Sequence, residues 1–171
     1  MSGHSKWSKI KHQKKITDAK RGKVFSKLSK LITIAARTSA NPDDNPSLRQ
    51  AIEQARSSNM PKANIDRAID KAQGKDGENL EEVVYEAFGP EGIGIIIKAL
   101  TDNKNRALAE IKAVLNKFNA SIGAPNSVAW MFENNKPKYP AQISNKSREL
   151  GEKLISELKE LDDVDQVYSS L

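Results

Sequence analysis

The sequence predicts an α+β protein: a three-helix bundle with a basic N-terminal arm, then a split βαβ (ferredoxin-like) antiparallel sheet with two helices on one face. Three observations predict this. Apolar residues recur at helical spacing up to about residue 73. The polar, glycine-containing stretch QGKDGENL follows. Beyond it, strand and helix patterns alternate in the order ββαβαβ. We therefore expect an arm over 1–21, a helical domain over 22–76 and an α+β domain over 77–171.

The N-terminal arm carries most of the positive charge. The first 40 residues hold eleven Lys and Arg against a single acid, Asp18, a balance of +10. Since the whole chain is only +6, the remainder sums to −4. Residues 1–20 show weak periodicity and many charges, so we interpret them as an arm that is either irregular or partly helical, rather than as a packed element.

Three amphipathic helices are predicted after the arm. The first begins at Lys23, and the Pro- and Asp-rich segment NPDDNP ends it. The second ends at Ser57-Ser58-Asn59, and the third starts at Pro61, a residue that suits a first helical position. Their expected apolar faces are, in chain order, Val24, Phe25, Leu28, Leu31, Ile32, Ala35 and Ala36; Leu48, Ala51, Ile52 and Ala55; and Ile65, Ala68, Ile69 and Ala72.

The second domain begins with a predicted hairpin, formed by EVVYEAFGP and GIGIIIKALT. A helix over NKNRALAEIKAVLNKFNA and a third strand over SVAWMFE follow. KPKYPAQ, with two prolines, is expected to be a loop. A helix over SRELGEKLISELKEL and a last strand over DQVYSS complete the sheet.

The composition argues against an enzyme and against a bound cofactor. There is no cysteine, which excludes disulfides and thiolate ligands, and two histidines in an arm are poor ground for a metal site or a preorganised base. GPEGIG does not open a helix, so it is read as a hairpin turn rather than a phosphate loop. The acidic residues Asp162, Asp163 and Asp165 are either a divalent-cation site or a solvated turn; we favour the turn, because hard cations usually need more converging oxygens.

The sequence suggests a cytoplasmic monomer. No apolar run reaches membrane-spanning length, and the N-terminus lacks the apolar region of a signal peptide. A mitochondrial transit peptide is a competing interpretation of the basic stretch, but such peptides favour Arg over Lys. Binding to a membrane surface ranks below nucleic acid, because Trp7, Ile10 and Ile16 alone make a thin apolar face.

Nucleic acid is the partner that the arm fits best. Each lysine that meets a phosphate releases condensed counterions, which gives salt-sensitive affinity with little sequence dependence. Trp7 either stacks on an unpaired base or anchors the arm on the bundle. The histidines are either further contacts or simply exposed. In TDNKNR, Asp102 or Asn103 is expected to cap a helix, while Lys104 and Arg106 are candidate phosphate contacts.

Several motifs together resemble the YebC family, which includes proposed bacterial transcriptional regulators and the mitochondrial translational activator of cytochrome oxidase. They are GHSKWSKIKHQK, DAKRGKVFSKL, NMPKANIDRAI, YEAFGPEGIGIIIKALTDNKNR and LDDVDQVY. The resemblance spans nearly the whole chain, and it weakens the transit-peptide interpretation because the arm is the family's opening motif. It implies a helical N-terminal domain followed by α/β domains. Family members usually carry a further α/β domain after the stretch resembling SVAWMFE, and here that inserted domain is expected to be missing.

The resemblance also implies binding residues. The expected nucleic-acid contacts of the arm are His4, Lys6, Trp7, Lys9, Lys11, His12, Lys14, Lys15, Lys20, Arg21 and Lys23. The expected secondary contacts are Lys62, Asn64, Asn103, Lys104 and Arg106. In the NMPK motif, Met60 and Pro61 are expected to be structural.

The resemblance leaves two functions open, and physical chemistry favours one of them. The first is a ribosome- or rRNA-associated translation factor that relieves stalling, for example at proline runs. The second is a DNA-binding transcriptional regulator. We favour the first, because the arm has no evident helix to read base edges in a major groove, and lysine–phosphate contact suits structured RNA. A protein-interaction module in which the arm is incidental is a third hypothesis.

Overall fold

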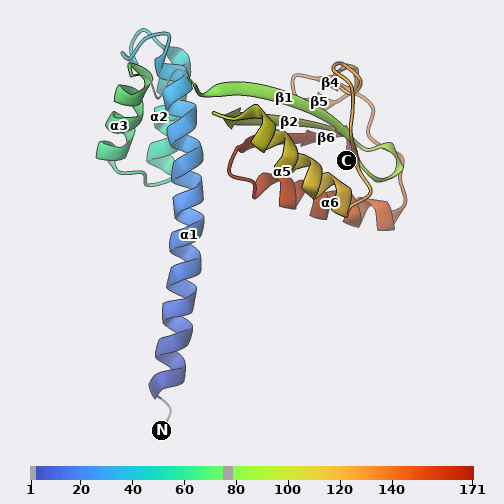
Figure 1. The fold of residues 1–171 in the computed structure, drawn as a ribbon, viewed down its shortest axis with the longest axis horizontal. Coiled ribbons are helices and arrows are strands. Elements are labelled where there is room, and N and C mark those ends of the chain that lie inside the picture. The colour runs from blue at the N-terminus through green and yellow to red at the C-terminus, as the bar shows by residue number, and fades with distance from the viewer. Residues whose placement is uncertain (1–2, 75–78) are drawn as a thin grey trace. The chain divides into compact units, whose positions relative to one another are not determined.

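The computed structural model describes the backbone of residues 3–74 and 79–171, and within it all side chains except those of residues 3–10, 12, 13 and 16. The chain forms two compact units, Met1–Glu78 and Asn79–Leu171. Figure 1 shows a helical unit followed by a unit in which helices pack on a sheet. The predicted α+β class is confirmed, with five helices and a four-stranded antiparallel sheet in the described part of the chain.

The helical unit consists of α1 (Gly3–Ala36), α2 (Pro46–Ser57) and α3 (Lys62–Ala72). The expected start of the first helix at Lys23 is wrong, because α1 already begins at Gly3 and runs through the predicted arm. The arm contains good helix formers such as lysine and no proline. It buries no face along its described side chains, so the apolar stripe by which a helix is recognised is missing there.

The C-terminal half of α1 builds the core of the helical unit. Ile32 and Ala36 pack there with buried residues of α2 and α3, and the Thr33 hydroxyl donates a 2.9 Å hydrogen bond to the backbone carbonyl of Ala68. Asn45 starts α2, because its side-chain oxygen accepts from the Leu48 N–H at 3.0 Å. Its amide donates to the carbonyl of Ala35 at 2.7 Å, which fixes the predicted break between the helices.

The second unit contains the predicted sheet. Its principal elements are β1 (Glu81–Phe88), β2 (Gly94–Thr101), α5 (Lys104–Lys117), β3 (Ser121–Ile122), α6 (Asn145–Lys159) and β6 (Val164–Ser169). The strand order is β3-β1-β2-β6, and all neighbours are antiparallel. The chain therefore passes from β2 through α5 to β3 with β1 between the two strands, as in a split βαβ arrangement.

Both helices of this unit pack on one face of the sheet, as predicted. Ile95 and Ile97 of β2 lie in one core with Ile111 of α5 and Leu154 and Leu158 of α6. The hairpin between β1 and β2 is also confirmed; its turn is a short 3-10 segment, Pro90–Gly92, in which Glu91 has a φ of 52° and Gly92 a φ of 82°.

The expected third strand over SVAWMFE is wrong. The third strand of the sheet is the two-residue β3, and the stretch around Trp130 forms a 3-10 turn, Ala129–Met131. The next residues form a separate hairpin, in which β4 (Phe132–Glu133) pairs with β5 (Lys136–Pro137), so the predicted loop KPKYPAQ contributes a short strand.

The stretch SVAWMFE is not a strand of the sheet because it packs on the second face of the sheet. Val128 and Phe132 are buried against Ile96 of β2. At Gly94 a Cβ atom would lie 2.7 Å from the Met131 sulfur and 2.9 Å from a Val128 methyl, so only glycine allows so close an approach. The Glu86 carboxylate accepts the backbone N–H groups of Asn126, Val128 and Ala129. Those donors are therefore not available to a strand ladder.

Candidate nucleic-acid interface

The basic part of α1 extends beyond the helices that pack on its other end (Figure 1). The helix has 34 residues, which corresponds to about 50 Å. Among the described side chains, packing against the core begins at Phe25, which is partly buried. Before that position the described cationic side chains are exposed; they are Lys11, Lys14, Lys15, Lys20, Arg21 and Lys23.

These cations surround the helix rather than form one stripe. Lys11, Lys14 and Lys15 share one side because they are three and four residues apart, and Arg21 lies two turns after Lys14. Lys20, at about 100° per residue, lies on another side of the helix. Such an arrangement gives a rod of positive charge that phosphates approach from several directions.

Five of the predicted arm contacts have only their backbone in the described structure. That backbone belongs to α1, and their side chains lie outside what the structure describes; the residues are His4, Lys6, Trp7, Lys9 and His12. The two interpretations of Trp7, base stacking or anchoring on the bundle, therefore both stay predictions.

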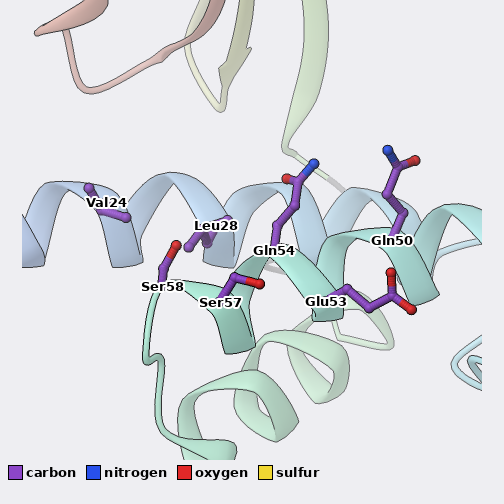
Figure 2. A pocket seen from close by; sticks show the side chains of 7 residues that line it. All are labelled: Val24, Leu28, Gln50, Glu53, Gln54, Ser57 and Ser58. Carbon is purple, nitrogen blue, oxygen red and sulfur yellow. The ribbon is translucent and has the colours of Figure 1, made fainter.

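A shallow groove between α1 and α2 adjoins the basic part of α1 (Figure 2). Val24 lies in this groove and is 44% exposed, although its place in the apolar stripe predicted burial. It lies one turn after Arg21, and so the groove continues one of the basic sides of the helix. The groove is lined by Val24, Leu28, Gln50, Glu53, Gln54, Ser57 and Ser58.

The NMPK motif lies at the start of α3. Met60 is buried in the core of the helical unit, and Pro61 is the residue that precedes the first helical turn. Lys62 is exposed at the first helical position. Asn64 accepts a hydrogen bond from the Arg67 guanidinium. Of the two predicted secondary contacts in this motif, Lys62 is thus the one with a fully exposed side chain.

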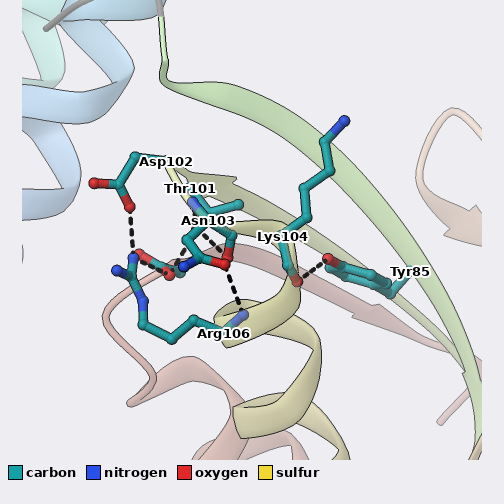
Figure 3. A network of polar contacts seen from close by, with 7 residues as sticks. Tyr85, Thr101, Asp102, Asn103, Lys104 and Arg106 are labelled. Carbon is teal, nitrogen blue, oxygen red and sulfur yellow. Dashed lines mark hydrogen bonds and ion pairs between the residues drawn. The ribbon is translucent and has the colours of Figure 1, made fainter.

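In TDNKNR, by contrast, the Arg106 guanidinium has carboxylate partners within the protein (Figure 3). Asn103 caps α5, since its side-chain oxygen accepts from the Arg106 N–H at 3.0 Å. Lys104 forms a 2.6 Å ion pair with Glu81. The Arg106 guanidinium lies 2.7 Å from Asp102 and 2.8 Å from Asp163. These hydrogen bonds, first to Asp163 and then to Asp102, raise the pKa of Arg106 above its usual value.

Asp163, just before β6, is hydrogen-bonded to β2 and to α5 at this end of the sheet. Its side chain is 5% exposed, and its carboxylate accepts from the Thr101 hydroxyl at 2.9 Å as well as from Arg106. Its backbone carbonyl accepts from the Leu100 N–H at 2.8 Å. The expectation of a solvated turn is therefore wrong for Asp163. The signal was not visible in the sequence, because the partners lie about 60 residues away.

No group of three or more His, Cys, Asp or Glu residues is arranged to hold a metal ion within 3–74 and 79–171. Over the same residues, no helix is long and apolar enough to cross a membrane.

Replacing Asp163 by asparagine is expected to lower the free energy of unfolding by about 1–3 kcal/mol. The variant keeps the shape of the side chain but removes the buried partner charge of Arg106, so that the hydrogen bonds from Arg106 and Thr101 meet a neutral amide oxygen instead of a carboxylate. Urea denaturation measures the loss. The matched control is Asp102→Asn, which touches the same guanidinium from an exposed position and should cost at most about 1 kcal/mol. Equal losses in both variants would contradict the structural role of Asp163.

Two family models match the chain. Residues 5–75 match the TACO1/YebC protein N-terminal domain, and residues 80–137 match the TACO1/YebC second and third domain. The motif LDDVDQVY, part of the resemblance seen in the sequence, lies beyond the matched residues.

Curated relatives are similar over most of this chain. A "Probable transcriptional regulatory protein" of Desulfosudis oleivorans is 56% identical over 135 residues, which cover 78% of this chain and 55% of the relative. A protein of the same description from Finegoldia magna is 50% identical over 78% of this chain and 56% of its own length. The chain thus spans about half the length of these relatives.

A solved structure is also similar. The crystal structure of a conserved hypothetical protein from Aquifex aeolicus superposes with a TM-score of 0.82 at 30% identity. The superposition covers 90% of each chain.

Proposed function

Because the chain belongs to the TACO1/YebC family, we propose that it is a non-enzymatic, nucleic-acid-binding regulator of gene expression that binds through the basic part of α1. The observation that carries this proposal is the exposed cationic surface before Phe25, within the first 40 residues, which hold eleven bases and one acid. Such a surface binds nucleic acid through release of the counterions condensed on its phosphates.

Within this function we favour a ribosome-associated translation factor that contacts rRNA and relieves stalling, for example at proline runs. The exposed cationic side chains described on the basic part of α1 are mainly lysine, and lysine–phosphate contacts position a protein without reading sequence. Structured RNA is recognised largely by shape and backbone, which suits such contacts. Of the secondary contacts, Lys62 supports this role best, because Lys104 and Arg106 are held in ion pairs.

A DNA-binding transcriptional regulator is the second candidate. It is favoured by the description of the relatives, "Probable transcriptional regulatory protein". This function requires a specific DNA site that is bound at least about a thousandfold more tightly than random duplex. Equal affinity for all duplexes would count against it.

Co-sedimentation with ribosomes at moderate salt tests the proposal. The intact chain is expected to travel with ribosomes, and a chain that lacks residues 2–20 is expected to stay at the top of the gradient. If neither travels with ribosomes but the intact chain shifts a specific duplex, the DNA-binding function replaces the translation function. If the truncated chain travels as well as the intact one, the second unit or the bundle carries the interaction and α1 is incidental.

A further inference from the structure

Trp130 and Tyr139 are the most exposed large apolar side chains in the described part of the chain, at 59% and 63% exposure. An exposed tryptophan is costly, since its ring offers a large apolar surface to water. Both residues belong to the second unit, whereas the basic segment of α1 belongs to the first. The proposed function does not use them.

The β4–β5 hairpin places these two rings opposite each other. Its loop is Asn134-Asn135, whose φ angles of 50° and 62° match the two-residue turn that closes tight hairpins. Beyond the paired strands, the Lys138 N–H donates to the Met131 carbonyl at 2.7 Å, which extends the register by one position. The next pair in that register is Trp130 and Tyr139. Their ring centroids are 6.1 Å apart with 48° between the ring planes.

Trp130 is held in place by its own hydrogen bond and by the packing of its neighbours in sequence. The Trp130 indole N–H donates a 2.8 Å hydrogen bond to the Ser127 carbonyl. The neighbouring Val128 and Phe132 are buried on the sheet. The Glu86 carboxylate binds the backbone N–H groups of Val128 and Ala129. A ring fixed in this way loses little conformational freedom when a ligand stacks on it.

The geometry leaves ring surface open to a ligand. Because the ring planes are tilted, the two rings do not cover each other face to face. The same hairpin carries Lys136 and Lys138, both exposed, and between residues 129 and 140 their charge is opposed by Glu133 alone. Flat π-faces beside cations are the combination by which proteins bind single-stranded nucleic acid.

We propose that Trp130 and Tyr139 form a stacking site for an unpaired base of a single-stranded nucleic acid, with Lys136 and Lys138 on its phosphates. The inference rests on the proposed function in that both assume a nucleic-acid target. It adds a second contact point. It also adds a preference for single strands over duplexes, since the bases of a duplex are already stacked on each other and cannot cover these rings.

Tryptophan fluorescence tests the site directly. The chain has two tryptophans, so Trp130 is the only one left in a Trp7→Phe background. A short RNA without self-complementarity is expected to quench this emission, and a duplex of the same length to leave it unchanged. In the same background, the double variant Trp130→Ala/Tyr139→Ala is expected to lose about 5- to 150-fold in affinity for the single strand, measured by anisotropy of the labelled RNA.

Control variants separate stacking from a general loss of structure. Trp130→Phe keeps an aromatic face and should retain most of the affinity. Val84→Ala truncates another exposed apolar side chain of the second unit, 51% exposed on β1, and should change nothing. Circular dichroism reports whether each variant stays folded.

The outcomes distinguish this inference from the proposed function. Single-strand binding that neither quenches Trp130 nor weakens in the double variant overturns the stacking site and leaves the role of α1 intact. Quenching that persists after charge reversal in α1 supports the stacking site and tells against α1 as the main contact. Quenching by a proline-rich peptide but not by the single strand would make the pair a peptide site and overturn the inference. Absence of binding to any nucleic acid would overturn both.

Discussion

Replacement of Lys11, Lys14 and Lys15 by glutamate is expected to reduce affinity for RNA by more than about a hundredfold at moderate salt. The three side chains are exposed on one side of α1. Each replaced lysine removes a phosphate contact, and each new carboxylate repels the same phosphate. The slope of log K against log salt should become shallower by about 2–3, one unit for each lost contact. Titrations at several salt concentrations measure both quantities.

The matched control carries the same change of net charge on the second unit. Lys112 of α5 and Lys146 and Lys153 of α6 are exposed, and their replacement by glutamate should leave RNA affinity within a fewfold of the parent. If both triple variants lose affinity equally, overall charge rather than α1 attracts the nucleic acid. That result would contradict the proposal that the protein binds nucleic acid through the basic part of α1.

Loss of binding in the α1 variant should not come from unfolding. Among the described side chains, packing against the bundle begins at Phe25, so Lys11, Lys14 and Lys15 contribute no core contacts. Glutamate is as good a helix former as lysine. The melting temperature should therefore match that of the parent, and a large decrease would contradict the exposed arrangement of this helix.

Much of the fold could be predicted from the sequence where one face of an element is buried. The stripe of Leu48, Ala51 and Ala55 in α2 lies in the core as expected, because burial imposes the helical period on the sequence. The same reasoning missed the beginning of α1, since an exposed helix imposes no period. In that part of the chain only the helix propensity of the residues indicates a helix, and helix propensity is a weak signal.

The misassigned strand shows a different limit. Val128, Trp130 and Phe132 are apolar residues at every second position, a spacing that imitates one face of a strand, yet Trp130 is exposed while the other two are buried. The backbone is turned instead by the carboxylate of Glu86, about 40 residues earlier in the chain. A contact so distant in sequence leaves no local signature, and this also holds for the burial of Asp163 by Thr101 and Arg106.

The candidate site also has one part that the sequence predicts and another that depends on contacts between distant residues. The basic segment could be found by counting charges, because it depends on composition alone. The pairing of Trp130 with Tyr139 could not be found, because it depends on the register of the β4–β5 hairpin and on the turn at Asn134 and Asn135. The structural role of Arg106 could not be predicted either, because its partner Asp163 is distant in sequence and only the fold brings the two side chains within 2.8 Å of each other.

Replacement of Glu86 by glutamine is expected to cost about 2–3 kcal/mol of folding stability at neutral pH. Glu86 is 9% exposed, and its two oxygens accept N–H groups at 2.7 Å from Asn126, 2.5 Å from Val128 and 2.9 Å from Ala129. Glutamine offers one acceptor oxygen, and its amide group meets at least one N–H donor to donor. Urea denaturation at neutral pH measures the loss. Glu82→Gln, on an exposed position of the same strand, is the control and should be nearly neutral.

The same variant should change how stability depends on pH. Burial alone raises the pKa of Glu86, but the three backbone hydrogen bonds outweigh it and lower the pKa below its ordinary value. The ionised carboxylate therefore stabilises the fold fully above about pH 4.3, the ordinary value for glutamate, and loses that contribution as the pH falls through the lowered folded value. Below that range Glu86→Gln should approach the parent in stability, whereas a constant difference down to pH 2–3 would contradict the role of the charge.

The effect of Glu86→Gln should also reach the aromatic pair. Since the carboxylate orients the backbone of Val128 and Ala129, weakening it loosens the segment that carries Trp130. In the Trp7→Phe background the emission of Trp130 should shift at neutral pH in Glu86→Gln and not in Glu82→Gln. An unchanged emission together with a lowered stability would mean that Glu86 supports the sheet but does not position the stacking site. The inference about Trp130 would then depend on the hairpin register alone.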